Sequence, residues 1–211
     1  TIDNNGNIGP EGCTEIPEYQ FRNDGLTGSV TIPDSVTVIG KAAFEHNKLT
    51  SVVFPDSVTS IGNMAFREND LTSVVIPDSV TYLGGGSFQY NKLTSVTIGN
   101  SITTIKTSAF ARNDLTPVTI PDSVTVIEWQ TFEYNKLTSV TIPNSVTSID
   151  ISAFVVNDLT SVYLFNSVTT LESTAFDSGV DVYREFGSCV DGHVFKHDNT
   201  LHVGDDCTSI A

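Results

Sequence analysis

A repeat with a period of about 22 residues constrains this chain more than any other feature, because a fixed period of that size is typical of solenoids. Phenylalanine recurs at this step through most of the sequence, and leucine follows it at the same step. The phenylalanines are Phe44, Phe66, Phe88, Phe110, Phe132, Phe154 and Phe176, and the leucines are Leu49, Leu71, Leu93, Leu115, Leu137 and Leu159. One copy earlier, Phe21 and Leu26 keep the pattern with one extra residue in the step. In a solenoid, each copy forms one rung and buries its apolar face by stacking on the next.

Each rung contains two extended segments and two turns. The residues after Leu-Thr alternate and are β-branched, which predicts a short strand stacked in parallel on its copies. A second extended piece of the form Ser-Val-Thr-x-Ile follows, and residues 62–69 predict one helical or 3₁₀ turn. We therefore expect a right-handed, β-dominated leucine-rich-repeat solenoid that is capped at both ends. Proline ends the first strand at Pro33, Pro55, Pro77, Pro121 and Pro143.

Continuous repetition from about Pro10 to Gly179 predicts one elongated domain without a linker. Residues 1–25 form an irregular lead-in and a truncated capping repeat in this interpretation. Residues 26–179 form the solenoid, and residues 180–211 form a final strand and a hairpin cap. Capping matters because an exposed sheet edge invites end-to-end pairing.

Val194–His197 and Thr200–Val203 flank Asp198-Asn199, a turn pair, and predict the hairpin of the C-terminal cap. Cys189 and Cys207 flank this hairpin, so we expect a disulfide between them and an oxidising compartment. The third cysteine, Cys13, aligns with Val36, a core position. It is therefore interpreted as a buried thiol.

Apolar positions of the rung define the expected core, and asparagine defines the turn. Leu49, Val52, Phe54, Val58, Ile61, Ala65 and Phe66 should line the interior, as should their copies. An asparagine two positions before each leucine is expected to bond the backbone of the turn, rung after rung. These residues are Asn47, Asn69, Asn91, Asn113, Asn135 and Asn157.

Composition excludes several classes of partner. The chain has 25 acidic and 10 basic residues and a net charge of -15, which disfavours nucleic acid and anionic membrane surfaces. No apolar run approaches the roughly 18 residues of a transmembrane helix, so no membrane insertion is expected. We find no nucleophile–base constellation and no phosphate-binding loop, and therefore expect no enzyme activity and no cofactor.

The repeat closely resembles the BspA-like leucine-rich-repeat proteins. The resemblance is carried by strings such as LTSVTIPNSVTSI and IGNMAF. It implies a secreted or surface protein that acts as an adhesin toward extracellular-matrix proteins or other cells, and it offers no catalytic motif. The departures from the family pattern are Gly99 and Phe165 for Pro, Lys106, Glu128 and Asp150 for Gly, and Thr131 for Ala.

The outward side chains of the first strand form the expected binding face, because this face is the usual binding surface of such solenoids. The candidates are Ser51, Val53, Ser73, Val75, Ser95, Thr97, Thr119, Thr141 and Tyr163. Most are small and polar, so aromatic anchors are sought in addition. The anchor candidates are Tyr82, Tyr90, Tyr134, Tyr163 and Trp129, of which Tyr82 and Tyr134 are assigned with Tyr163 to the binding face. We expect weak or multivalent binding of a protein or glycan ligand, such as a component of the extracellular matrix.

Three further patterns of columns, meaning residues at equivalent positions of successive rungs, carry alternative hypotheses. Lys48, Asp70, Lys92, Asp114, Lys136 and Asp158 alternate in charge and are expected to pair at every step. Asp34, Asp56, Asp78 and Asp122 form an acidic edge, interpreted as turn caps, with calcium bridging as the alternative.

The third pattern is a pair of threonine columns, expected to form hydroxyl ladders. They are Thr27, Thr50, Thr72, Thr94, Thr116, Thr138 and Thr160, and Thr14, Thr37, Thr59, Thr81, Thr103, Thr125, Thr147 and Thr169. Ice binding through these arrays is the outside alternative for the function. The main alternative to adhesion is a structural protein that self-assembles into a sheet or filament.

Overall fold

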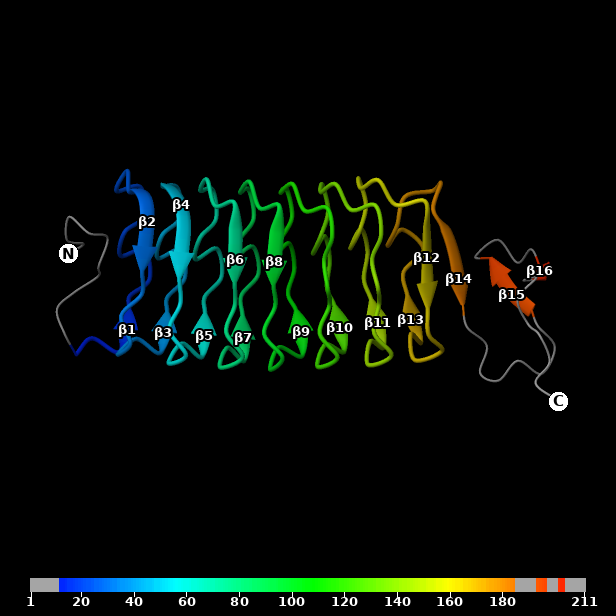
Figure 1. The fold of residues 1–211 in the computed structure, drawn as a ribbon, viewed down its shortest axis with the longest axis horizontal. Helices are drawn as coiled ribbons and strands as arrows, with labels where there is room; N and C mark the ends of the chain where they lie inside the picture. The colour runs from blue at the N-terminus through cyan, green and yellow to red at the C-terminus, as the bar shows by residue number, and fades with distance from the viewer. Residues whose placement is uncertain (1–11, 185–192, 197–200, 204–211) are drawn as a thin grey trace.

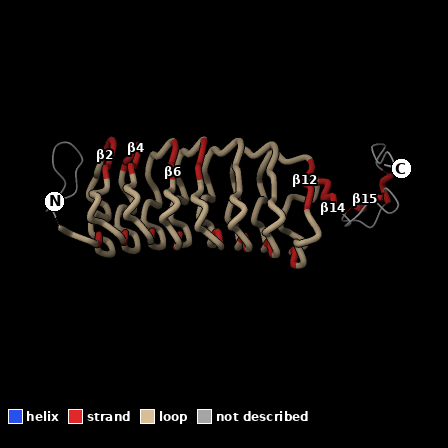
Figure 2. The backbone as a smooth tube through the Cα atoms, turned by 60° about the horizontal axis from the view of Figure 1, so that its bottom comes forward, coloured by secondary structure: helices blue, strands red, loops and turns tan. Residues whose placement is uncertain are grey.

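The computed structural model describes residues 12–184, 193–196 and 201–203. Its rungs stack along one axis into an elongated column, which confirms the predicted leucine-rich-repeat solenoid (Figure 1). Most of each rung is turn or loop, and the strands are short segments that recur at the same place in successive rungs (Figure 2).

The first extended segment of the rung lies on what we call the strand face. Its strands pair in parallel and in the register set by the repeat, so that Val30 lies opposite Val52, and Val74 opposite Val96. Val30, Val52 and Val74 are buried while their neighbours along the strand point outward, as alternation predicts. The strands are β2 (Thr27–Thr31), β4 (Lys48–Val53), β6 (Ser73–Val75), β8 (Ser95–Thr97) and β12 (Ser161–Leu164).

The second extended segment forms a second side of the column. Its two-residue strands are also parallel, with Ile39 opposite Ile61 and Ile61 opposite Leu83. These strands are β1 (Glu15–Ile16), β3 (Val38–Ile39), β5 (Ser60–Ile61), β7 (Tyr82–Leu83), β9 (Thr104–Ile105), β10 (Val126–Ile127), β11 (Ser148–Ile149) and β13 (Thr170–Leu171).

The third side, which we call the turn side, differs from the prediction. The expected helical or 3₁₀ turn is wrong, because no helix occurs in the described residues. Met64 and Glu68 instead have positive φ angles of 58° and 55°. With these angles the N–H groups of Phe66 and Glu68 point at the next rung and donate to the carbonyl oxygens of Ser87 and Gln89, over 2.8 and 3.0 Å. Bonding between rungs therefore overrides the local preference for a helical turn.

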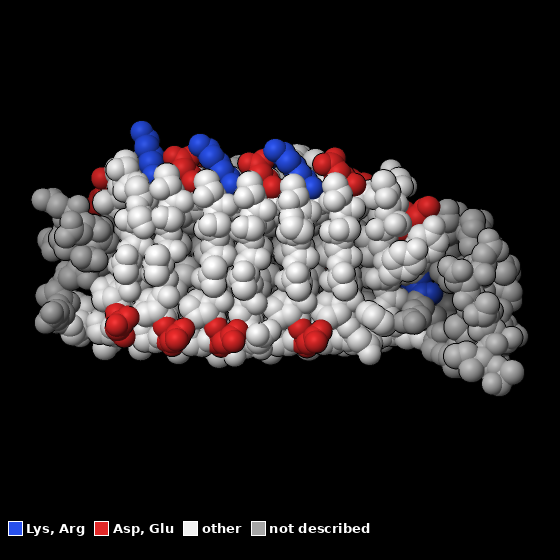
Figure 3. Space-filling view, in the orientation of Figure 1, with Lys and Arg blue, Asp and Glu red and all other residues white. Residues whose placement is uncertain are grey.

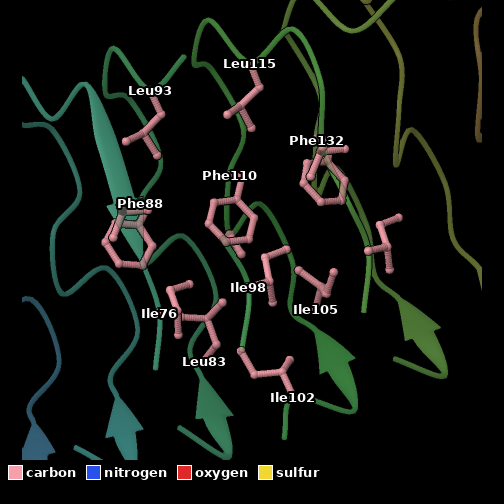
Figure 4. Packing of buried hydrophobic residues seen from close by; sticks show 14 of the residues in the cluster. Ile76, Leu83, Phe88, Leu93, Ile98, Ile102, Ile105, Phe110, Leu115 and Phe132 are labelled. Carbon is pink, nitrogen blue, oxygen red and sulfur yellow. The ribbon is translucent and has the colours of Figure 1, made fainter. Parts of the chain in front are cut away.

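The phenylalanine column forms the centre of the core (Figure 4). Phe44, Phe66, Phe88, Phe110, Phe132 and Phe154 are all fully buried. Their rings stack in near-parallel planes, with centroids from 5.0 Å apart at Phe44–Phe66 to 5.9 Å at Phe88–Phe110. Phe54, which was expected in the interior, is only partly buried and packs edge-on against Phe66.

The asparagine column ties neighbouring rungs together. The Asn113 side-chain nitrogen donates to the carbonyl oxygens of Phe110 in its own turn and Phe88 in the preceding rung, both at 3.0 Å. Its side-chain oxygen accepts the N–H of Leu93 at 3.0 Å. The same pattern recurs from Asn47 to Asn157. Each amide thus satisfies backbone groups that the turn leaves unpaired in the core.

The second side is divided into two sheets between β7 and β9. At each glycine of the column Gly40, Gly62 and Gly84, an added Cβ would lie within 2.7 Å of a backbone atom of the preceding rung. Lys106 follows Gly84 in this column and carries a side chain, and the step to its rung has the widest ring spacing of the spine. We attribute this break between the two sheets to a difference in spacing: rungs with glycine at this position pack closely, whereas rungs from Lys106 onward must leave room for a Cβ.

We predict faster amide exchange at this break. In the described chain, the N–H groups of Thr103 and Lys106 make no hydrogen bond to the preceding rung, whereas the equivalent groups of Thr125 and Glu128 donate over 2.8 and 3.0 Å. Exchange monitored by NMR should therefore be faster at Thr103 and Lys106, because fewer bonds must open. Equal protection at both pairs would contradict the break.

The ends of the described chain bear on three sequence hypotheses. β14 (Asp181–Arg184) extends the strand face beyond β12, and the hairpin of β15 (His193–Lys196) and β16 (Leu201–Val203) pairs with it antiparallel. Cys189, Cys207 and residues 1–11 lie outside the described residues. Cys13 is exposed, so its assignment as a buried thiol is wrong. It differs from Val36 because no described rung lies beyond it.

Candidate recognition surface

The strand face is largely uncharged between two charged edges (Figure 3). Serine and threonine side chains dominate it, and its exposed apolar residues include Val53 and Val75, 54% and 63% exposed. At its C-terminal end Tyr163 is 68% exposed and stacks on Tyr183, with ring centroids 4.9 Å apart. The face thus offers one aromatic anchor next to a flat surface of small side chains.

The edge where the strands begin carries the alternating charges. Lys92 pairs with Asp70 at 2.7 Å and Lys136 pairs with Asp114 at 2.6 Å. The hydrogen bond from Lys136 to Asp114 and the attraction of that carboxylate raise the pKa of Lys136.

The expected pairing at every step is wrong, because no other ion pair forms within this column among the described residues. Strand pairing follows the same alternation: β6 pairs with β8, and Thr119 with Thr141. The structural unit on this edge is therefore a pair of rungs, in which a lysine reaches back to the preceding aspartate.

The opposite edge carries the exposed carboxylates of Asp34, Asp56, Asp78 and Asp122. Asp78 caps a neighbouring turn, since its carboxylate accepts the N–H of Asn100 at 2.8 Å. In the part of the chain that the structure describes, no group of three or more His, Cys, Asp or Glu could hold a metal ion. Calcium bridging stays a prediction.

Threonine hydroxyls follow the second side, but within the described part of the chain they do not bond to one another. Thr37 and Thr59 donate instead to the backbone carbonyl oxygens of Thr14 and Thr37, at 3.1 and 3.2 Å. The expected hydroxyl-to-hydroxyl ladder is therefore wrong, because the carbonyl of the preceding rung lies within reach. The ice-binding hypothesis stays a prediction.

The anchor candidates do not share one face. Tyr82 belongs to β7 on the second side, where its hydroxyl lies 3.3 Å from the side-chain oxygen of Asn63. Tyr134 lies on the turn side with a positive φ of 55°. The interpretation of Tyr82, Tyr134 and Tyr163 as one binding face is thus wrong, because each occupies a different position of the rung.

The turn side holds the densest charge network of the described chain. The side chain of Glu45 is only 3% exposed, and it pairs with Arg22 at 2.7 Å and with Arg67 at 3.0 Å. Arg67 also pairs with Glu68 at 2.9 Å, and His46 contacts Glu68 at 2.6 Å. Nearby, the hydroxyl of Tyr19 raises the pKa of Lys41. The ion pairs with Glu45 and Glu68 hold Arg67 in a fixed position.

Arginine and tyrosine alternate along the next rungs of the turn side. The guanidinium of Arg67 lies 5.4 Å from the ring centroid of Tyr90. Arg112 follows, 5.2 Å from Tyr90 and 4.0 Å from Tyr134. Sequence reasoning named Tyr90 and Tyr134 as anchor candidates but missed Arg112 between them, because it treated the segment as a local helical turn. The signal was present, since the three residues stand at equivalent positions of successive repeats.

A second charged cluster lies at the corner of the turn side and the second side. The Glu128 carboxylate accepts from Lys106 at 2.9 Å and from the N–H and hydroxyl of Thr107, each at 3.0 Å. Burial, the largest single influence, favours protonation of Glu128. The three hydrogen bonds and the charge of Lys106 together outweigh it, so the pKa of Glu128 lies below its usual value.

The repeat matches a family model described as the BspA-type leucine-rich-repeat region, over residues 14–136 and 59–182. The chain belongs to this family. Comparison with curated proteins finds no match. The described part of the chain contains no helix of the length and hydrophobicity that crossing a membrane requires.

Solved structures support the fold of this BspA-type chain. A leucine-rich-repeat protein from Bacteroides ovatus is 22% identical with a TM-score of 0.57, and the match covers 73% of this chain and 47% of that protein. The pneumococcal vaccine antigen PcpA is 19% identical with a TM-score of 0.53, and the match covers 75% of this chain and 47% of that protein. This chain thus spans about half the length of either protein.

Proposed function

We propose that this BspA-type chain is a noncatalytic recognition module of the cell surface or extracellular space that binds a protein ligand. Proteins of the family are typically recognition modules, and one similar structure is described as a vaccine antigen. The observation that carries the proposal is the arginine–tyrosine column on the turn side, where Tyr90 and Tyr134 are 40% and 41% exposed and Arg112 is partly exposed between them. Tyrosine and arginine are enriched among the residues that dominate binding energy at protein interfaces.

The column suits binding because its side chains are already ordered. The rings and guanidinium groups hold one another in place, and the backbone beneath them is bonded from rung to rung. A partner therefore orders few additional side chains when it docks, which lowers the entropic cost of association. The strand face, with Tyr163 as its exposed anchor, offers fewer such groups.

Binding of the purified chain to an array of extracellular-matrix proteins at physiological salt tests the proposal. Tyr134→Ala should weaken saturable binding at least about tenfold, as loss of an interface anchor does. Tyr82→Ala and Tyr163→Ala are matched controls on the other two sides and should change it little.

Three outcomes would contradict this assignment. Loss of binding in Tyr163→Ala alone would move the binding surface to the strand face. A blank array would argue against protein recognition. A blank array with concentration-dependent mass in light scattering would favour self-assembly.

A further inference from the structure

Arg112 is an arginine without an anionic partner. The other arginines of the described chain are engaged: Arg22 and Arg67 pair with Glu45, and Arg184 donates to the carbonyl oxygen of Val168 at 2.7 Å. Arg112 forms no ion pair or side-chain hydrogen bond among the described residues, and its guanidinium lies over the rings of Tyr90 and Tyr134. Its guanidinium therefore keeps its hydrogen-bonding capacity.

The two rings fix how the guanidinium is presented. A guanidinium carbon 4.0 Å from the centroid of Tyr134 lies over the face of that ring, so the N–H groups at its edge are not used by the stack. These donors form a planar fork that matches the two oxygens of a carboxylate. Tyr90, Arg112 and Tyr134 stand on successive rungs, so a ring flanks the fork on either side.

The surroundings leave this charge uncompensated. Glu133 stands on the next rung and its backbone carbonyl accepts the Arg112 N–H at 2.8 Å, yet its carboxylate forms no ion pair with Arg112 in the described chain. On the same side of the solenoid, two rungs earlier, the guanidinium of Arg67 forms ion pairs with both Glu45 and Glu68. An unpaired, ordered guanidinium is locally complementary to an incoming carboxylate. The net charge of -15 opposes the approach of an anion at long range, and physiological salt screens that repulsion.

We propose that Arg112, with Tyr90 and Tyr134, forms a clamp for an aspartate or glutamate side chain of an acidic, extended peptide segment on the partner protein. The carboxylate takes the guanidinium fork, and residues on either side of it contact the half-exposed rings. An extended peptide advances about 3.3 Å per residue, and alternate side chains point to the same side. When the carboxylate occupies Arg112, the peptide side chains two positions before and after it therefore lie over the neighbouring rungs. This inference rests on the proposed protein-recognition function and names its partner chemistry.

Fluorescence polarisation with two labelled peptides tests the clamp. One peptide carries three central glutamates, and its counterpart carries glutamines of the same shape without charge. The wild-type chain should bind the glutamate peptide at least about tenfold more tightly, because charge-assisted bidentate bonds are lost with glutamine. Arg112→Gln should abolish this preference, and Arg112→Lys should restore only part of it, since lysine keeps the charge without the fork.

Lys48→Gln is the charge-matched control. Lys48 is exposed and makes no ion pair in the described chain, so its loss should leave peptide binding within about twofold of wild type. Thermal melting of each variant separates lost binding from lost folding, and Tyr134→Phe supplies a second variant that keeps the ring beneath the guanidinium.

Several results would overturn the clamp. Equal affinity for the two peptides, or an unchanged preference in Arg112→Gln, would refute it, and matrix-protein binding that persists in Arg112→Gln would then leave the proposed function standing. Binding of a carboxylated oligosaccharide such as oligogalacturonate, without binding of the glutamate peptide, would assign the surface to a glycan. A failure of both the peptides and the matrix array would count against the clamp and the proposed function together.

Discussion

Phe110→Ala is expected to lower the free energy of unfolding by about 3–5 kcal/mol, as large-to-small changes in packed cores do. Phe110 is fully buried and stacks on Phe88 and Phe132, with centroid distances of 5.9 and 5.6 Å. Removing its ring interrupts the spine at mid-column and leaves a cavity that two rigid rungs are unable to close. Urea unfolding followed by circular dichroism measures the loss.

Val75→Ala is the control for this prediction. Val75 lies on the strand face and is 63% exposed, so its truncation should change stability by no more than about 0.5 kcal/mol. A loss below about 1 kcal/mol in Phe110→Ala would mean that the neighbouring rungs collapse onto the gap.

Asn113→Ala is expected to lower the free energy of unfolding by about 1–3 kcal/mol, although it removes no apolar surface, because a buried polar group left without a partner costs about that much. The change leaves the N–H of Leu93 without its acceptor, which lies at 3.0 Å. The carbonyl oxygens of Phe88 and Phe110 each lose one of two donors, because Asn91 and Asn135 still donate to them over 3.2 and 3.0 Å. The same unfolding measurement checks the effect.

Two further variants sharpen this second prediction. Asn166→Ala removes an exposed asparagine of a different column and should change stability little. Asn113→Asp keeps the acceptor for Leu93 but sets a carboxylate against two carbonyl oxygens, so it should be destabilised at neutral pH. A stability near wild type in Asn113→Ala would show that water replaces the amide.

The core and the asparagine column follow from the sequence because both depend only on the repeat. Phe110 and Asn113 recur at every rung, and any stacking of identical rungs brings identical positions together. The first strands were predictable for the same reason, since alternation along each copy settles which side chains point inward. The divided second side was not predictable, because the change from Gly84 to Lys106, where the glycines of this column end, acts through the distance between rungs.

The candidate recognition surface was predictable only in part. Tyr90 and Tyr134 were recognised as anchor candidates, yet Arg112 was not, and Tyr82 was assigned to the same face as Tyr163. To assign a tyrosine or arginine to one side of the rung, the backbone path of the turn must be known. That path depends on positive φ angles at residues such as Tyr90, Arg112 and Tyr134. No local sequence preference signals this conformation for a side-chain-bearing residue, because it is unfavourable by itself.

The sequence by itself determined the solenoid, the rung length, the residues of the core and the membership in a repeat family. It did so because a hydrophobic period is a property of the chain that any stacked structure must respect. Only the tertiary structure decided which charges meet, as in Lys92 with Asp70, and how Arg112 comes to lie between two rings. Those contacts join residues of different rungs, and their geometry depends on backbone conformations that bonding between rungs imposes.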